Sequence, residues 1–392
     1  MHLSPTVQGI AEPATLLMAR RCRELKAQGK DVIDLSLGEP DHAPPAFALK
    51  AAEEALKGNW NKYTPVNGYQ DVREAIARKF KRDNGLQYTA EQIVISTGAK
   101  QAIMNVVMSL IGPGDEVVIP APFWVTYAEQ VKMAGGKPVI VPSSLEEDWK
   151  APIDRIAAAI TPRTRLLMFS SPCNPSGSVL TGGELEALAA VVAKHPELYV
   201  ISDEIYEHIV FEGTHRSFAA LPGMLERTIT VNGLSKAFAL TGWRLGYLGA
   251  PQWIAKACTT VQGQFTSGTN SIAQRVALAC MEADPGQLMG MRNDFLRRRD
   301  LVLNALKAIP SWRCNVPQGA FYVLPDVRSS INGTTIKNSV DLSLHLLDAA
   351  GVSVVEGDSF GAPGTLRISF ATSDAKLVEA IARIAKAVAE LK

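Results

Sequence analysis

Three polar residues with complementary chemistry each follow a short apolar run of the sequence. They are Asn174 after Leu166–Phe169, Asp203 after Leu198–Ser202, and Lys236 after Thr228–Val231. In open α/β sheets, ligands bind beyond the carboxyl ends of the strands. If the three runs are parallel strands of one sheet, an amide, a carboxylate and an amine meet at the same edge.

A fourth segment, residues 96–101, predicts an anion site at that edge. Ile93–Ser96 has the pattern of a buried strand, and the apolar spacing from Lys100 to Ile111 indicates a helix. Gly98 lies between them, and the free N–H groups at the start of a helix bind anions. Each feature also has a simpler explanation: a helix cap for Asp203, a turn before proline for Asn174, chain reversal for Gly98, and a solvated side chain for Lys236. Their shared edge favours a binding site.

Together these side chains suit a phosphorylated aldehyde on a pyridine ring. Lys236 can condense with the aldehyde, and that bond can later pass to a substrate amine. Asp203 would keep the ring nitrogen protonated, which makes the ring an electron acceptor. Tyr206 is placed to donate to the ring oxygen, while Ser235 and Arg244 suit the phosphate.

The elements that must position these residues predict an α/β fold. Short buried runs alternate with helical patterns from about residue 46 to residue 290, as in a mostly parallel central sheet flanked by helices. Further runs at 116–119 and 138–141 fit the same sheet, and a helix is expected over about 124–133. We predict that residues 46–290 form a large domain.

The remaining chain has a different pattern. A long helix is expected over about 293–308 and another over about 374–391, with apolar runs at 320–324, 352–355 and 366–370 between them. This α+β pattern predicts a smaller domain built from both chain ends, residues 1–45 and 291–392. The basic residues Arg297–Arg299 are expected to form one solvated stretch of the long helix.

Several motifs occur in an order that resembles a known family over essentially the whole chain. They are Ser36–Asp41, Tyr63–Pro65 with Gly68, Ser171–Gly177, Ser202–Tyr206, Ser235–Phe238 and Gly242–Gly246. The chain resembles the class I aminotransferases of fold type I, pyridoxal 5'-phosphate (PLP) enzymes. It is most similar to the bacterial aspartate aminotransferases that carry a lysine in the phosphate-binding turn.

The resemblance implies a role for each matching residue. For the cofactor it implies Lys236 as the Schiff-base lysine and Asp203 as the partner of the ring nitrogen. Asn174 and Tyr206 would contact the ring oxygen, and Trp124 would stack on the ring. The residues in or around the phosphate turn would be Gly98, Ala99, Lys100, Ser235 and Arg244. It also implies a homodimer with shared sites, in which Tyr63 reaches the cofactor phosphate of the neighbouring subunit.

For the substrate, the resemblance implies contacts to an amino acid and a 2-oxo acid. Arg367 would bind the α-carboxylate, Gly38 would contribute a backbone contact, and Trp124 and Asn174 would line the site. Lys100 would bind a distal carboxylate, helped by Thr15, although Pro13 stands where the subgroup has a serine. The expected reaction is ping-pong transfer of an amino group from aspartate to 2-oxoglutarate. One alternative is a transaminase of the same family that prefers prephenate, aromatic amino acids or alanine. Another is a different PLP enzyme such as a C–S lyase.

Composition argues against several other classes of protein. The formal net charge of +1 attracts neither nucleic acid nor anionic lipid. The chain has no signal-like start and no run of 18 apolar residues, and its five cysteines form no C-x-x-C pair, so we expect a cytoplasmic protein with reduced thiols. The dispersed histidines do not suggest a metal site.

Two further enzyme classes fail on sequence. Residues 357–361 spell G-x-S-x-G, the pattern of a serine hydrolase, but no histidine follows Ser359, as the order of that triad requires. A nicotinamide dehydrogenase would need G-x-G-x-x-G after a predicted strand, and the sequence has none.

Overall fold

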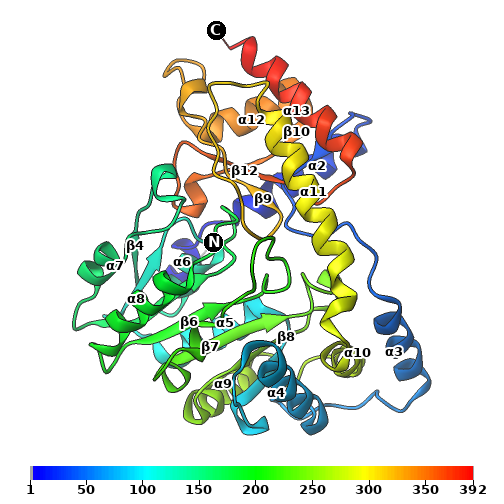
Figure 1. Cartoon of the computed structure of the whole chain (residues 1–392), viewed down its shortest axis with the longest axis vertical. Coiled ribbons are helices and arrows are strands. Elements are labelled where there is room, and N and C mark those ends of the chain that lie inside the picture. The colour runs from blue at the N-terminus through cyan, green and yellow to red at the C-terminus, as the bar shows by residue number, and fades with distance from the viewer. Residues whose placement is uncertain (1–2, 392) are drawn as a thin grey trace.

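The computed structural model describes residues 3–391. A seven-stranded sheet forms the centre of the molecule (Figure 1). Its strands are β2 (Ile93–Ser96), β3 (Glu116–Pro120), β4 (Lys137–Val141), β5 (Thr164–Ser170), β6 (Tyr199–Asp203), β7 (Thr228–Gly233) and β8 (Gly246–Gly249). Their order is β2-β8-β7-β6-β5-β3-β4, and all are parallel except β8, which is antiparallel to both neighbours. The predicted mostly parallel sheet is confirmed, with β8 as an unpredicted addition.

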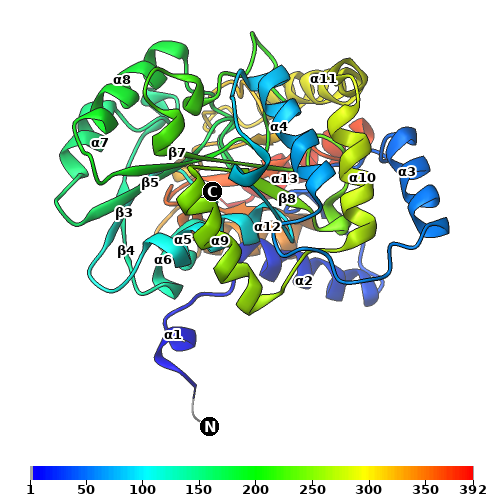
Figure 2. The same cartoon turned by 90° about the horizontal axis from the view of Figure 1, so that it is seen from below.

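Helices cover both faces of this sheet because its strands are apolar on both sides (Figure 2). Along β3, Val117 and Ile119 pack into one hydrophobic cluster, while Val118 packs into another on the opposite face. One face carries α5 (Ala99–Leu110), α6 (Thr126–Met133) and α9 (Gln252–Phe265). The other carries α4 (Gln70–Asn84), α7 (Ile153–Ala159), α8 (Gly182–Ala193) and α10 (Ser271–Glu282), with α3 (Ala46–Lys57) against α10.

Both ends of the chain contribute to a second, smaller group of elements, in the upper half of Figure 1. Strands β9 (Tyr322–Val323), β11 (Val355–Glu356) and β12 (Leu366–Ser369) form an antiparallel sheet, and β1 (Ile33–Asp34) pairs in parallel with β10 (Val352–Ser353). The helices of this group are α2 (Ala14–Ala27), α11 (Met289–Leu306), α12 (Ser339–Ala350) and α13 (Asp374–Ala389); the short α1 (Pro5–Gln8) precedes them. The domain boundaries themselves remain a prediction.

The expectation of a solvated basic stretch on α11 is wrong for two of its three arginines. Arg298 and Arg299 are only 9% and 7% exposed. Nη1 of Arg298 donates to Asp41 at 2.6 Å, and Nη1 of Arg299 donates to the carbonyl oxygen of Pro317 at 3.0 Å. Consecutive helical residues point in different directions, so a helix packed on several sides buries part of any such run.

Two findings bear on the environment of the chain. None of the helices between residues 3 and 391 combines the length and apolar character that crossing a membrane requires. All five cysteines are free thiols, and four of them are buried.

Candidate active site

The strand order of the sheet brings the predicted polar residues to one edge. Strands β5, β6 and β7 are adjacent and parallel, so their carboxyl ends lie together. Asp203 is the last residue of β6, while Asn174 and Lys236 lie in the turns that follow β5 and β7. The amide, the carboxylate and the amine therefore meet, as the sequence predicts.

These residues line a cavity of about 310 Å³ between the large sheet and the smaller group of elements. The predicted site residues in its wall are Thr15, Gly38, Ala99, Lys100, Trp124, Asn174, Asp203, Tyr206, Ser235, Lys236, Arg244 and Arg367. Gly98 lies just behind the wall, as the residue that precedes α5. Tyr63 lies away from the cavity, and its side chain is 98% exposed.

Asp203 is a buried carboxylate held by two donors. The hydroxyl of Tyr127 donates to its Oδ2 at 2.6 Å, and the N–H of Ile205 donates to its Oδ1 at 3.2 Å. Burial nevertheless raises the pKa of Asp203 to about 6, with the Tyr127 hydrogen bond opposing the rise. A cation placed against this carboxylate would favour its ionised form, which is what a protonated ring nitrogen would provide.

Tyr127 is a functional residue that the sequence analysis missed. It lies on α6, far from Asp203 in the chain, and its ring makes an edge-on contact with Trp124, with 5.6 Å between ring centroids. The motif Pro122-Phe123-Trp124 pointed to the tryptophan alone. Only the packing of α6 against the sheet brings the Tyr127 hydroxyl to Asp203.

The Lys236 amine has the environment of a nucleophile. Its Nζ donates to the carbonyl oxygen of Gly38. Burial and the nearby positive charge of Arg367 together lower the pKa of Lys236 to about 8. A substantial neutral fraction at neutral pH is what condensation with an aldehyde requires.

Arg367 is a buried cation on β12, only 1% exposed. Its Nη1 donates to Oδ1 of Asn174 at 3.1 Å, its Nη2 donates to the carbonyl oxygen of Ser36 at 2.5 Å, and the ring of Tyr322 lies 4.6 Å from its Cζ. Within residues 3–391, no carboxylate forms an ion pair with it. A buried guanidinium that lacks an anion is costly, so this arrangement fits an incoming carboxylate.

The opposite end of the cavity fits a phosphate. Gly98 has φ 84° and precedes the 12-residue helix α5, whose first residues, Ala99 and Lys100, line the cavity. A Cβ at Gly98 would lie 2.5 Å from Nη2 of Arg244, and one at Gly246 would lie 2.2 Å from the backbone nitrogen of Ala99. Both glycines therefore let backbone and guanidinium come close together, with the Ser235 hydroxyl nearby. The donor set matches the phosphate, ring and aldehyde of PLP.

Lys100 and Thr15 occupy another part of the wall. Nζ of Lys100 lies 4.9 Å from the centre of the Trp124 ring, and burial together with Arg244 lowers the pKa of Lys100. Thr15 belongs to the first turn of α2. Pro13 immediately precedes that helix, provides no side-chain cap and does not line the cavity.

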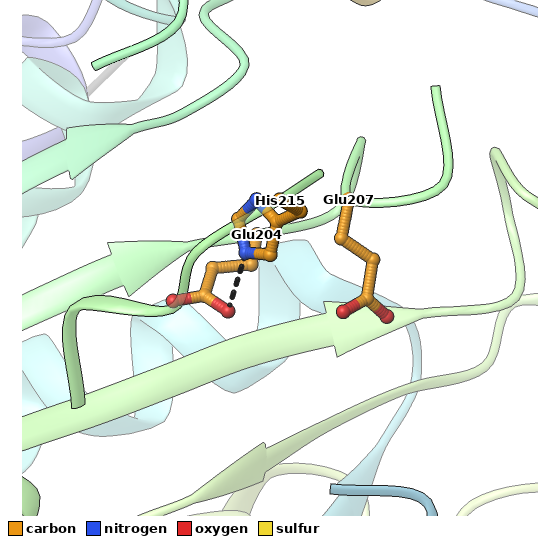
Figure 3. Close-up of side chains that lie close together, drawn as sticks. All are labelled: Glu204, Glu207 and His215. Carbon is orange, nitrogen blue, oxygen red and sulfur yellow. Dashed lines mark hydrogen bonds and ion pairs between the residues drawn. The ribbon is translucent and has the colours of Figure 1, made fainter. Parts of the chain in front are cut away.

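A second cluster of titratable groups lies behind the turn that follows β6 (Figure 3). Glu204, Glu207 and His215 place their ligand atoms within 4.8 Å of one another, a spacing that metal ligands also show. Figure 3 shows His215 facing Glu204, with 2.9 Å between Nε2 and Oε2. Burial would lower the pKa of His215, but Glu204 raises it above its ordinary value.

Protein donors already hold both carboxylates of this cluster. Oε1 of Glu204 accepts from the hydroxyls of Ser202 at 2.9 Å and Ser217 at 2.8 Å. Glu207 accepts from Lys79, and from the side-chain amides of Asn84 at 2.6 Å and Asn232 at 2.7 Å. Burial would raise the pKa of Glu207, but Lys79 holds it well below its ordinary value. The cluster is an internal ion-pair network that anchors the turn between Asp203 and Tyr206.

The serine of the G-x-S-x-G pattern has a structural partner. Ser359 lies in a single turn, residues 358–360, and its hydroxyl donates to Oε1 of Glu356 at 2.5 Å. Its backbone N–H donates to Oε2 of the same carboxylate at 2.9 Å. Ser359 does not line the cavity and does not belong to the cluster that contains His215, so the motif serves local structure.

Comparison with known proteins gives one consistent family. The model of aminotransferase class I and II matches residues 30–384. A bifunctional aspartate aminotransferase and glutamate/aspartate-prephenate aminotransferase of Petunia hybrida is 44% identical, with 100% of this chain and 84% of that protein covered. An aspartate/prephenate aminotransferase of Cereibacter sphaeroides is 42% identical, with 97% of each covered.

A solved structure agrees. The aspartate aminotransferase of Thermus thermophilus with maleate has a TM-score of 0.94 and 40% identity, covering 99% of this chain and 100% of that one. The chain therefore belongs to the aminotransferase class I and II family and has the fold of the fold type I enzymes. It is a transaminase, and this family membership implies PLP as its cofactor. The roles of individual site residues remain predictions.

Proposed function

We propose that this chain transfers the amino group of aspartate to 2-oxoglutarate by a ping-pong reaction that uses PLP. The observation that carries the proposal is the meeting of Lys236, Asp203 and Arg367 in one cavity of a class I and II aminotransferase. When bound, PLP supplies an electron-accepting ring that stabilises negative charge at the substrate Cα.

The residues of the chain divide the remaining work. Lys236 would hold the cofactor through Nζ and, once released, move the proton at the substrate Cα, for which its lowered pKa is suited. Asp203 would hold positive charge at the ring nitrogen, and Asn174 and Tyr206 would hold the ring oxygen. Arg367 would orient the substrate through two parallel hydrogen bonds to its α-carboxylate.

The phosphate end and the ring face would use the remaining predicted residues. The phosphate would bind to Gly98, Ala99, Ser235 and Arg244, because helix N–H groups and a guanidinium together neutralise a dianion. Trp124 would cover one face of the ring. Gly38 would contact the substrate through its backbone.

Lys100 supports a dicarboxylic substrate. It is a cation in the cavity wall that pairs with no carboxylate among residues 3–391. With Arg367 it would give the cavity two cationic side chains, which suit the two carboxylates of aspartate. Thr15 would add a hydroxyl on the Lys100 side, whereas Pro13 cannot.

Prephenate is a second candidate for the amino acceptor. The Petunia and Cereibacter relatives carry prephenate in their names, and both match this chain over nearly its whole length. Prephenate is also a dicarboxylate, so the same pair of cations would serve it. Alanine and the aromatic amino acids lack this second carboxylate.

We also propose a homodimer with shared sites in the cytoplasm. The 98% exposure of Tyr63, an aromatic side chain in a turn, supports its contact with a second subunit. The five free cysteines support a reducing compartment.

The proposal is tested on protein reconstituted with PLP. Borohydride reduction followed by peptide mass spectrometry is expected to place a pyridoxyl group on Lys236. Incubation with aspartate and 2-oxoglutarate is expected to yield glutamate equal to the 2-oxoglutarate consumed, and replacing 2-oxoglutarate by prephenate tests the second candidate. Modification at another lysine, or consumption of aspartate without formation of glutamate, would contradict the assignment.

A further inference from the structure

The contact between Tyr206 and Tyr322 joins two parts of the cavity that the proposed function uses separately. The phenol oxygens lie 2.9 Å apart, and both side chains are buried, Tyr206 at 3% and Tyr322 at 0% exposure. Tyr206 follows β6 of the large sheet, whereas Tyr322 lies on β9 of the small one (Figure 1). Tyr322 is therefore a wall residue that sequence analysis did not identify.

Tyr322 has a second partner on its ring face. The guanidinium carbon of Arg367 lies 4.6 Å from the centre of that ring, and Ser369 of the same strand pairs in register with Tyr322. A cation over the face of a phenol draws electron density from the ring, which makes the hydroxyl a better hydrogen-bond donor. Nζ of Lys236 lies farther from the Tyr206 ring, 6.0 Å from its centre, so the closer Arg367 favours donation by Tyr322.

The number of hydroxyl protons in the Tyr206–Tyr322 pair determines what each hydroxyl can still donate to. Each hydroxyl has one proton, so only one of the two can donate to the other. If Tyr322 donates to Tyr206, the Tyr206 proton is free to point into the cavity. The reverse arrangement would use the Tyr206 proton inside the pair and leave none for a bound ring oxygen.

Close packing holds Tyr322 in this position. A Cβ added at Gly38 would lie 2.6 Å from the Tyr322 hydroxyl, so only glycine at this position lets the loop pack so closely against this oxygen. The rings of Tyr206 and Tyr322 meet edge-on, with centroids 6.0 Å apart. The hydroxyl of Tyr322 therefore has a defined location and a defined partner.

We propose that Tyr322 is a positioning residue that directs the Tyr206 hydroxyl toward the cofactor ring oxygen and couples it to the cation that binds the substrate carboxylate. The inference rests on the proposed function, because it assigns Tyr206 to that oxygen. Tyr322 acts only through Tyr206 and touches no reacting atom.

The experiment is a pH titration of the visible absorbance of the PLP-loaded protein without substrate. A donor to the ring oxygen stabilises its anionic form, so weaker donation raises the midpoint at which the bound cofactor loses its proton. Tyr322→Phe is expected to raise that midpoint by about half a unit to one unit, the effect of weakening one hydrogen bond. Tyr206→Phe is expected to raise it further.

The double variant Tyr206→Phe/Tyr322→Phe separates this role from a general structural one. If Tyr322 acts through Tyr206, the double variant has the same midpoint as Tyr206→Phe alone. Tyr88→Phe is the matched control, because it removes another buried phenol hydroxyl, bonded to Thr230 at 3.1 Å and outside the cavity. It is expected to leave the midpoint unchanged.

The outcomes distinguish this inference from the proposed function. An unchanged midpoint in Tyr322→Phe, or equal shifts from Tyr322→Phe with and without the Tyr206 hydroxyl, overturns the positioning role while the transaminase assignment stands. A wild-type protein that forms no visible cofactor band on Lys236 overturns both. A variant that does not fold is replaced by Tyr322→His, which keeps a ring and a donor and is expected to retain part of the wild-type behaviour.

Discussion

Replacing Asp203 by asparagine should make the cofactor-free protein more stable at neutral pH while it damages the enzyme. The carboxylate lies in a buried position without a cation bonded to it, and burial raises its pKa from 3.8 to about 6. An acid whose pKa is raised by folding contributes stability while it is protonated, and this contribution is lost as the pH rises through the folded-state pKa.

The size of the effect follows from the two pKa values. A difference of about 2 units corresponds to about 3 kcal/mol. Below about pH 3 the carboxyl is protonated in the folded and unfolded states, so wild type and Asp203→Asn differ only by their hydrogen bonds. The asparagine has one acceptor oxygen for two donors, Tyr127 and Ile205, which costs about 1 kcal/mol at every pH.

The assay is denaturant unfolding of both cofactor-free proteins between pH 4 and pH 7.5. The free energy of unfolding of Asp203→Asn, relative to wild type, is expected to rise by about 2.5 kcal/mol over this range. Asp71→Asn is a control of opposite sign, because the hydrogen bond from Arg275 holds the pKa of Asp71 below its ordinary value. With PLP bound, Asp203→Asn should lower turnover by about 10²–10³-fold.

A stability difference that stays constant with pH, or that favours wild type increasingly toward pH 7.5, would refute this reasoning. It would mean that the Asp203 carboxylate is well stabilised without a cofactor. Near-normal turnover of the loaded variant would separately reject the role of Asp203 at the ring nitrogen.

Three further predictions concern other charged side chains. Lys100→Ala should raise KM for aspartate about 10–150-fold, because one charge-assisted hydrogen bond is lost, and should leave KM for alanine nearly unchanged. An equal rise in KM for both amino acids would contradict the distal-carboxylate role. Arg367→Gln should weaken aspartate and alanine alike by at least about 10-fold in steady-state kinetics, and a loss confined to aspartate would argue against α-carboxylate binding. Lys79→Met should lower the free energy of unfolding, measured in urea, by about 3–5 kcal/mol, because Glu207 stays buried without its cation. The double variant Lys79→Met/Glu207→Gln should recover much of the lost stability, and no recovery would contradict the pairing.

The elements of the large sheet could be read from the sequence because each is a short run of β-branched or other apolar residues. Such runs remain buried on both faces, so their local pattern and their environment agree. Strand β8 was missed because its four residues, Gly-Tyr-Leu-Gly, include two glycines and give no such pattern. It pairs through its backbone, and its glycines allow Ala99 and Tyr88 to approach.

The sequence alone determined which chemical groups the protein would bring to the sheet edge. Asn174, Asp203 and Lys236 lie at the carboxyl ends of their strands or within four residues of them, so a parallel sheet is sufficient to bring them together. The motifs around them were enough to identify the family, which the comparisons confirm.

Only the tertiary structure decided how those groups are held. Tyr127 reaches Asp203 from α6, and Tyr322 reaches Tyr206 from a different sheet, across 76 and 116 positions of the chain. Arg298 and Arg299 are buried by packing on α11 that their basic run does not reveal. Local sequence patterns report the environment of neighbouring residues, whereas hydrogen bonds between distant segments depend on how helices and sheets pack, which no local pattern encodes.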